Sequence, residues 1–140
     1  MKASLQPGIA LVKRITVDRD RTISFMGDAG RVYATPWLVG DIEYTCRDLI
    51  LEHADAGEDS VGVEVAVKHL APTLPAMTVE ITVRVNAVVG RKVTLDVVAR
   101  DELDEIARGT HTRFVVDTAK TIERLKAKAA RLGEQMRVRK

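Results

Sequence analysis

The spacing of apolar residues along the chain changes once, from a helical repeat to a repeat of two. Within residues 35–53 the apolar positions lie three and four residues apart, which predicts a helix. Thr35 suits the N-cap and Pro36 suits the first helical position, where the missing N–H of proline costs no hydrogen bond within the helix. We expect this helix to end near residues 53–57. The stripe consists of Leu38, Val39, Ile42, Cys46, Leu49 and Ile50.

From residue 60 onward, apolar and polar residues alternate, as in strands that bury one face. Residues 8–18 suggest a short irregular strand, and the polar, glycine-containing residues 19–32 suggest a loop. A second amphipathic helix is expected at 118–132. The long strands are expected at 60–70, 77–89, 92–101 and 105–117.

This order of elements predicts an α+β hot-dog fold, in which an antiparallel sheet wraps around a long central helix, with a C-terminal helix added. One face of the sheet must be buried, and the helix predicted at residues 35–53 is the only long apolar element that can pack against it. A ferredoxin-like sandwich is the competing fold, but it needs two crossover helices between strands, whereas the second helix here comes last. One helix cannot cover so wide a sheet alone, so pairing with a second copy is expected.

Length and composition fit a single domain over residues 1–140 that needs no disulfide or metal. Cys46 is the only cysteine, which excludes an intramolecular disulfide and favours a reducing compartment. Apolar runs are too short for a signal peptide or for the roughly 20 residues that span a bilayer. We therefore expect a cytoplasmic protein without a membrane partner.

Positive charge gathers at the C-terminal end. Residues 120–140 hold eight Lys or Arg and two Glu, so 118–140 is expected to form a basic helix and tail. A nucleic-acid-binding module is one interpretation, but no strand face interleaves aromatic and basic residues. A solvated helix is the preferred interpretation, because blocks of like charge are commonly solvated tails. No nucleic-acid partner is expected.

Glu43 is the first candidate for chemistry, because it interrupts the apolar run YATPWLVGDIEYTC. It lies about 100° around the helix from Ile42 and so borders the buried stripe. Burial there is expected to desolvate the carboxylate and raise its pKa, as in a catalytic base or nucleophile. The alternative is an exposed ion pair with Arg47, one helical turn further on.

His69 and Thr35 are two further candidates. His69 ends a strand in which Val61 to Val67 alternate, so we expect it at the rim of their buried face as an acid, base or orienting group. A structural histidine is the alternative. Thr35, at a helix N-terminus, can hydrogen-bond an oxyanion. It lies eight residues from Glu43, roughly 12 Å of helix, so joint action needs substrate, a partner chain or non-helical geometry.

The segment GTHTRF places His111 and Arg113 on one strand face. Arg113 can hold a carboxylate or phosphate, and the alternative is a cross-strand ion pair at the sheet surface. The three histidines and one cysteine match no zinc spacing, so no metal is expected. No glycine-rich phosphate loop occurs.

Three stretches together resemble the fluoroacetyl-CoA thioesterase family of hot-dog proteins, over about residues 8–125. They are ATPWLVGDIEYTC, SVGVEVAVKHLAPTLPAM and GRKVTLDVVARDELDEIARGTHTRFVV. The resemblance implies that Thr35, Glu43 and His69 act together in thioester hydrolysis. It also implies roles for Gly62 as an active-site glycine and for Arg113 as a supporting residue.

The implied activity is hydrolysis of a short or small acyl-CoA by a homodimer or a tetramer, with coenzyme A present only as part of the substrate. Glu43 would attack the thioester or activate water. The family's Phe-rich segment before the helix is shorter here, SFMGDAGRVY, so the resemblance leaves the acyl group open. Two alternatives are a non-catalytic acyl-CoA-binding or regulatory hot-dog protein and a hot-dog dehydratase, which would release no thiol.

Overall fold

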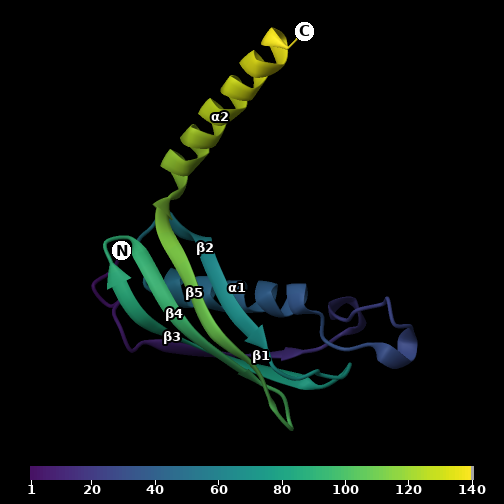
Figure 1. Ribbon diagram of the computed structural model, residues 1–140. Helices are drawn as coiled ribbons and strands as arrows, with labels where there is room; N and C mark the ends of the chain where they lie inside the picture. Colours follow the sequence, from purple (N-terminus) through teal and green to yellow (C-terminus); the bar gives the residue numbers. More distant parts are fainter. Residues whose placement is uncertain (140) are drawn as a thin grey trace.

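The computed structural model describes residues 1–139 and contains one antiparallel sheet curved around a long helix (Figure 1). The strand order β1-β3-β4-β5-β2 leaves β1 and β2 at the two edges. This is the predicted α+β arrangement. The strands are β1 (Ala10–Thr16), β2 (Glu58–His69), β3 (Thr78–Val89), β4 (Lys92–Arg100) and β5 (Glu105–Asp117). The helices are α1 (Thr35–Leu51) and α2 (Thr118–Val138), with 3-10 turns at Arg19–Arg21 and Asp28–Gly30.

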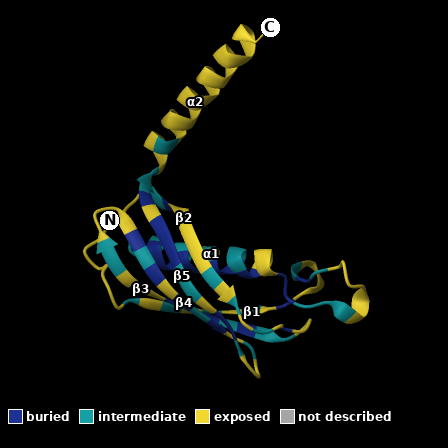
Figure 2. Cartoon of the chain, viewed as in Figure 1, coloured by how far each residue is buried: buried dark blue, intermediate teal, exposed yellow. Residues whose placement is uncertain are grey.

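Helix α1 lies in the hollow of the sheet, because its apolar stripe faces the strands. It packs against β1, β2, β3 and β5 (Figure 2). Burying each large aliphatic side chain stabilises the fold by about 1.5–3 kcal/mol, so this contact is the main source of stability. The fully buried residues of the stripe are Leu38, Ile42, Cys46, Leu49 and Ile50, and those of the facing strands include Val79, Ile81, Val83 and Leu95.

Strand β2 is held to the sheet by β5 alone, and a glycine allows their close approach. A Cβ atom at Gly109 would lie 2.0 Å from the carbonyl oxygen of Ala66, so no larger residue fits there. The β2–β5 register shifts between Gly62 and Glu64. Gly109 and this register shift together fix the distance of β2 from β5 and the direction in which the side chains of β2 point.

Most of the predicted buried valine face of β2 is exposed in the structure, where β2 is largely exposed along its length (Figure 2). Val61, Val63 and Val65 are 46%, 64% and 41% exposed, so the prediction is wrong for these three, whereas Val67 is partly buried against the core. Alternation predicts a shared face only in a regular strand, and the register shift between β2 and β5 puts Val61 and Val65 on opposite faces. Nor does alternation show that anything covers a face. Here β2 is an edge strand, and an exposed apolar edge is a surface for pairing with another strand.

Two helix ends differ from the sequence prediction. Thr35 is the first residue of α1 and not its N-cap, which is Ala34, a residue with no capping side chain. Leu51 ends α1, earlier than residues 53–57. The hydroxyl of Thr35 is therefore free for a contact outside the helix.

Helix α2 projects away from the sheet, and none of its described residues is buried (Figures 1 and 2). Its N-cap is Asp117, whose side chain accepts a hydrogen bond from the backbone N–H of Lys120. The predicted basic tail reaches Lys140, which lies outside the described residues. No helix in the described chain is both long enough and apolar enough to cross a bilayer.

Candidate active site

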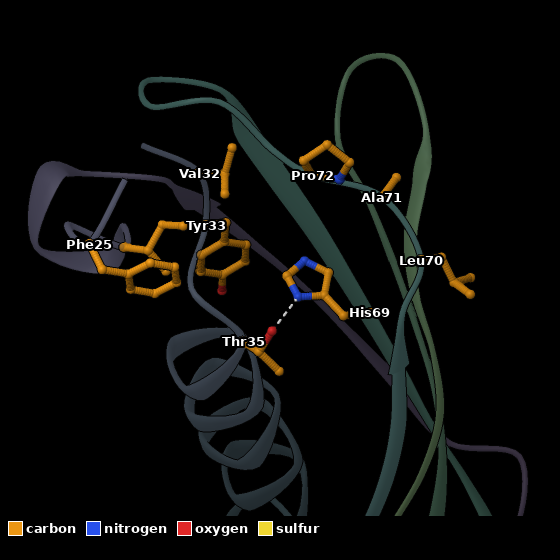
Figure 3. Close-up of a pocket in the computed structure, with 9 residues that line it drawn as sticks. Phe25, Val32, Tyr33, Thr35, His69, Leu70, Ala71 and Pro72 are labelled. Atoms are coloured by element: carbon orange, nitrogen blue, oxygen red, sulfur yellow. Dashed lines mark hydrogen bonds between the residues drawn. The ribbon is translucent and has the colours of Figure 1, made fainter. Parts of the chain in front are cut away.

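The first residue of α1 meets the last residue of β2 in a side-chain hydrogen bond. The Oγ1 atom of Thr35 lies 2.7 Å from Nδ1 of His69 (Figure 3). The pair borders a mainly apolar cavity of about 380 Å³, and this places two of the predicted site residues together. The other residues that line the cavity are Ile23, Phe25, Val32, Tyr33, Leu70, Ala71 and Pro72.

Burial shapes the chemistry of His69. Desolvation lowers the pKa of its imidazole, so the ring is neutral near pH 7. Its Nε2 atom is buried and has no hydrogen-bond partner among the described residues. When Thr35 donates to Nδ1, the neutral ring carries its proton on Nε2. The pair therefore offers an unused polar atom beside an apolar cavity.

Glu43 lies in a second cluster, further along α1 and beside the start of β2. Its Oε1 atom is 3.9 Å from Nε2 of His111. A Cβ atom at Gly62 would lie only 2.8 Å from that carboxylate oxygen, so the glycine leaves the space that Glu43 occupies. A cavity of about 320 Å³ opens at this cluster. Its lining is Glu43, Tyr44, Arg47, Ser60, Val61, Gly62 and Arg113.

A buried arginine forms the base of this second cluster. Arg113 donates from Nε to Oγ of Ser60 at 2.7 Å and from Nη2 to the Ser60 carbonyl at 2.6 Å. Its Nη1 lies 3.2 Å from Nε2 of His111, whose Nδ1 donates to the Glu64 carbonyl at 2.8 Å. Burial lowers the pKa of Arg113, while the charge of Glu43 acts in the opposite direction. The alternative of a surface ion pair is therefore wrong, because Arg113 is buried.

Two expectations about Glu43 itself are corrected. Its side chain is 42% exposed, so in a single chain the carboxylate is not desolvated. It does not pair with Arg47, which instead binds both carboxylate oxygens of Asp59, at 2.9 and 2.7 Å. Glu43 therefore faces an open surface beside buried cationic and polar groups.

The buried carboxylate of α1 is Asp41, which was not among the predicted site residues. It is 6% exposed and accepts hydrogen bonds from the hydroxyl of Tyr33 and the guanidinium of Arg21. Its position three residues after Leu38, on the apolar stripe itself, is the sequence feature that indicates this burial. Ser60, the anchor of Arg113, had no comparable pattern to reveal it.

The two clusters do not meet within one chain. Thr35 and Glu43 are separated by eight residues of α1, roughly 12 Å of helix rise. His69 joins the first cluster and Gly62 the second, so both clusters include a residue of β2. The structure thus brings Thr35 together with His69, and Glu43 together with Gly62 and Arg113.

Comparison with known proteins decides the family. A model of the family described as fluoroacetyl-CoA-specific thioesterase matches residues 17–119, a range that includes all five predicted site residues. The chain belongs to this family. The fluoroacetyl-CoA thioesterase of Streptantibioticus cattleyicolor is 38% identical over 89 residues, which is 64% of this chain. The match likewise spans 64% of the length of that relative.

Solved structures in the family share the fold. A point mutant of the fluoroacetyl-CoA-specific thioesterase FlK superposes with a TM-score of 0.83 at 30% identity, over 91% of this chain and 99% of that one. The same mutant in complex with fluoroacetate and CoA superposes with a TM-score of 0.78 at 31% identity, over 84% of this chain and 99% of that one. A hypothetical protein from Thermus thermophilus, described as a thioesterase superfamily member, superposes with a TM-score of 0.79 at 31% identity, over 94% of this chain and 96% of that one. The hot-dog prediction and the family resemblance are confirmed.

Proposed function

We propose that this protein is a thioester hydrolase that cleaves a short or small acyl-CoA to the free acid and CoA. The observation that carries the proposal is the Thr35–His69 hydrogen bond beside a largely apolar cavity, in a chain of this family. An acyl group fits an apolar cavity, and a thioester carbonyl at its mouth would meet the polar pair. The fluoroacetyl-CoA thioesterases to which the chain is similar support the reaction class.

We propose further that a second copy of the chain completes the site. The exposed edge of β2 is suited to antiparallel pairing with its own copy about a two-fold axis. An axis between Val65 and Ala66 would set Gly62 of one chain opposite His69 of the partner subunit. Glu43 beside Gly62 would then approach the Thr35–His69 pair of the other chain, and its exposed carboxylate would become covered.

In this arrangement Glu43 acts on the thioester carbonyl by one of two routes. As a nucleophile, its carboxylate oxygen bonds to the acyl carbon while the C–S bond breaks. CoA leaves as the thiolate and takes up a proton, and water then splits the anhydride and restores Glu43. As a base, Glu43 takes a proton from the attacking water and passes it to the departing sulfur.

The other site residues support the developing negative charge. Thr35 and His69 hydrogen-bond the reacting group, and backbone N–H groups near Gly62 or the start of α1 meet the oxyanion. Arg113, fixed by Ser60, keeps a positive charge near Glu43. A cavity of about 130 Å³ lined in part by Arg91, Lys120 and Arg124 offers cations for the CoA phosphates.

The test is release of free thiol from a panel of short, branched and aryl acyl-CoAs, with Glu43→Gln assayed in parallel. Glu52→Gln is the matched control, because Glu52 is an exposed glutamate just beyond the end of α1. Release that Glu43→Gln abolishes and Glu52→Gln retains is the expected result. Tight acyl-CoA binding without release from any substrate would instead favour a ligand-binding protein.

A further inference from the structure

A buried polar network ties the loop before α1 to the helix itself. The hydroxyl of Tyr33 donates to Oδ2 of Asp41 at 2.5 Å. The guanidinium of Arg21 donates to the same carboxylate from Nε at 3.0 Å and from Nη2 at 3.3 Å. Tyr33 is 1% exposed and Asp41 is 6% exposed, whereas the side chain of Arg21 is 25% exposed, so the phenol and the carboxylate are buried and the guanidinium covers them from the surface.

Such a network is costly to bury, and its members are fully partnered. A carboxylate removed from water is destabilising unless donors replace its hydration, and Asp41 receives three. Arg21 is itself held by Asp18 at 2.7 Å and stacks 5.2 Å from the centre of the Trp37 ring. Arg21 and Asp41, with the groups that they contact, therefore hold the loop before α1 in one position relative to the helix, whereas apolar residues at these positions would allow several.

The network reaches both members of the Thr35–His69 pair. Tyr33 stands two residues before Thr35, and its own N–H donates to the Thr73 carbonyl at 2.8 Å. The next N–H, of Ala34, donates to the Arg21 carbonyl at 2.8 Å. The ring of Tyr33 lies edge-on to His69, with centroids 6.5 Å apart and planes at 80° (Figure 3).

We propose that Tyr33, Asp41 and Arg21 form a positioning network that holds Thr35 and His69 in hydrogen-bonding geometry. The catalytic consequence rests on the proposed thioesterase function. The hydroxyl of Tyr33 is committed to Asp41, while its ring lines the cavity. Tyr33→Phe therefore removes the tie to α1 and leaves the ring in place.

The first test needs no activity. The chain has three histidines, so imidazole ¹⁵N NMR resolves them, and His69→Asn assigns the resonances of His69. Tyr33→Phe and Asp41→Asn are expected to weaken the Thr35–His69 hydrogen bond and move the Nδ1 shift of His69 toward that of a free imidazole. Asp48→Asn is the matched control, because Asp48 is a carboxylate of α1 that pairs with Lys13 at 2.7 Å. Unchanged His69 resonances in both folded network variants overturn the proposal.

The second test is kinetic. Because Thr35 would act in the transition state, Tyr33→Phe is expected to lower kcat about tenfold with KM within about twofold of wild type. In a Thr35→Ala background the same change should cost less than about twofold, since the Thr35–His69 hydrogen bond that the network holds is already gone. A full tenfold loss in that background overturns the positioning role. If the wild-type protein releases no thiol, the thioesterase proposal fails while the NMR test still decides the network.

Discussion

The Thr35–His69 cluster and the Glu43 cluster, both beside β2, differ in the charge and in the exposure of their polar groups. Thr35 and His69 form a neutral pair in apolar surroundings, joined by one hydrogen bond. The carboxyl group of Glu43 is 42% exposed and lies near the buried guanidinium of Arg113. A neutral pair can polarise a carbonyl without burying a charge, whereas a carboxylate becomes a stronger base or nucleophile when water is removed from around it. The contrast suggests that each cluster is half of one site, assembled when two chains cover Glu43.

The largest effect expected from this division is complementation between two inactive variants. Glu43→Gln and His69→Asn are each expected to lose about 100-fold or more in kcat. Refolding them together should restore about a quarter of wild-type turnover, because half of the dimers are mixed and each mixed dimer keeps one intact site. Thiol release before and after mixing measures this. If native mass spectrometry finds mixed dimers without recovered turnover, the site does not span two chains.

The next largest effect separates the hydroxyl of Thr35 from its place in the helix. Thr35→Ala is expected to lower kcat about 100-fold, since it removes the hydroxyl that donates to Nδ1 of His69 and so keeps the Nε2–H of that ring as a donor for the reacting group. Thr35→Ser keeps the hydroxyl and should stay within a few-fold of wild type. Steady-state kinetics with thermal unfolding as a control for folding measure both. Equal losses in the two variants would assign Thr35 a packing role.

A smaller effect is expected at the glycine that faces Glu43. In Gly62→Ala the new Cβ would meet Oε1 of Glu43 at 2.8 Å and Cε1 of His111 at 3.3 Å. The carboxylate ends a flexible side chain, so it would shift, and kcat should fall about tenfold while the fold persists. Gly133→Ala is the matched control, because its Cβ meets nothing within 4 Å. Wild-type turnover of Gly62→Ala would remove Gly62 from the site.

Most of the fold was predictable from the sequence, because its determinants are local. The helical spacing of Leu38, Ile42 and Cys46 belongs to α1, and the period of two in β3 and β4 belongs to strands with one buried face. The face of β2 was not predictable in the same way. Its valines alternate regularly, but their exposure depends on the position of β2 at the sheet edge and on the bulge after Gly62.

The candidate site was only partly predictable, for a related reason. Local patterns singled out Thr35, Glu43 and His69, the family resemblance implied that they act together, and the structure pairs Thr35 with His69. Periodicity assigned the buried carboxylate to Glu43, whereas Asp41 is the one that is buried. The position of Asp41 on the apolar stripe indicates burial, but a buried carboxylate also needs a partner that donates to it. For Asp41 that partner is Arg21, twenty residues earlier, which no local pattern links to it.

The smallest expected effect is on stability and compares the histidines of the two clusters. Burial lowers the pKa of both His69 and His111, so the folded chain binds fewer protons than the unfolded chain around pH 6. Their contribution is therefore fully present above about pH 6.5 and is lost as the pH falls through the depressed folded values. Urea unfolding at pH 7.5 and pH 5 should show this loss, and it should be smaller in His69→Asn, which lacks one of the two groups. A loss that is unchanged in His69→Asn would show that His69 is solvated in the folded protein and not held neutral against Thr35.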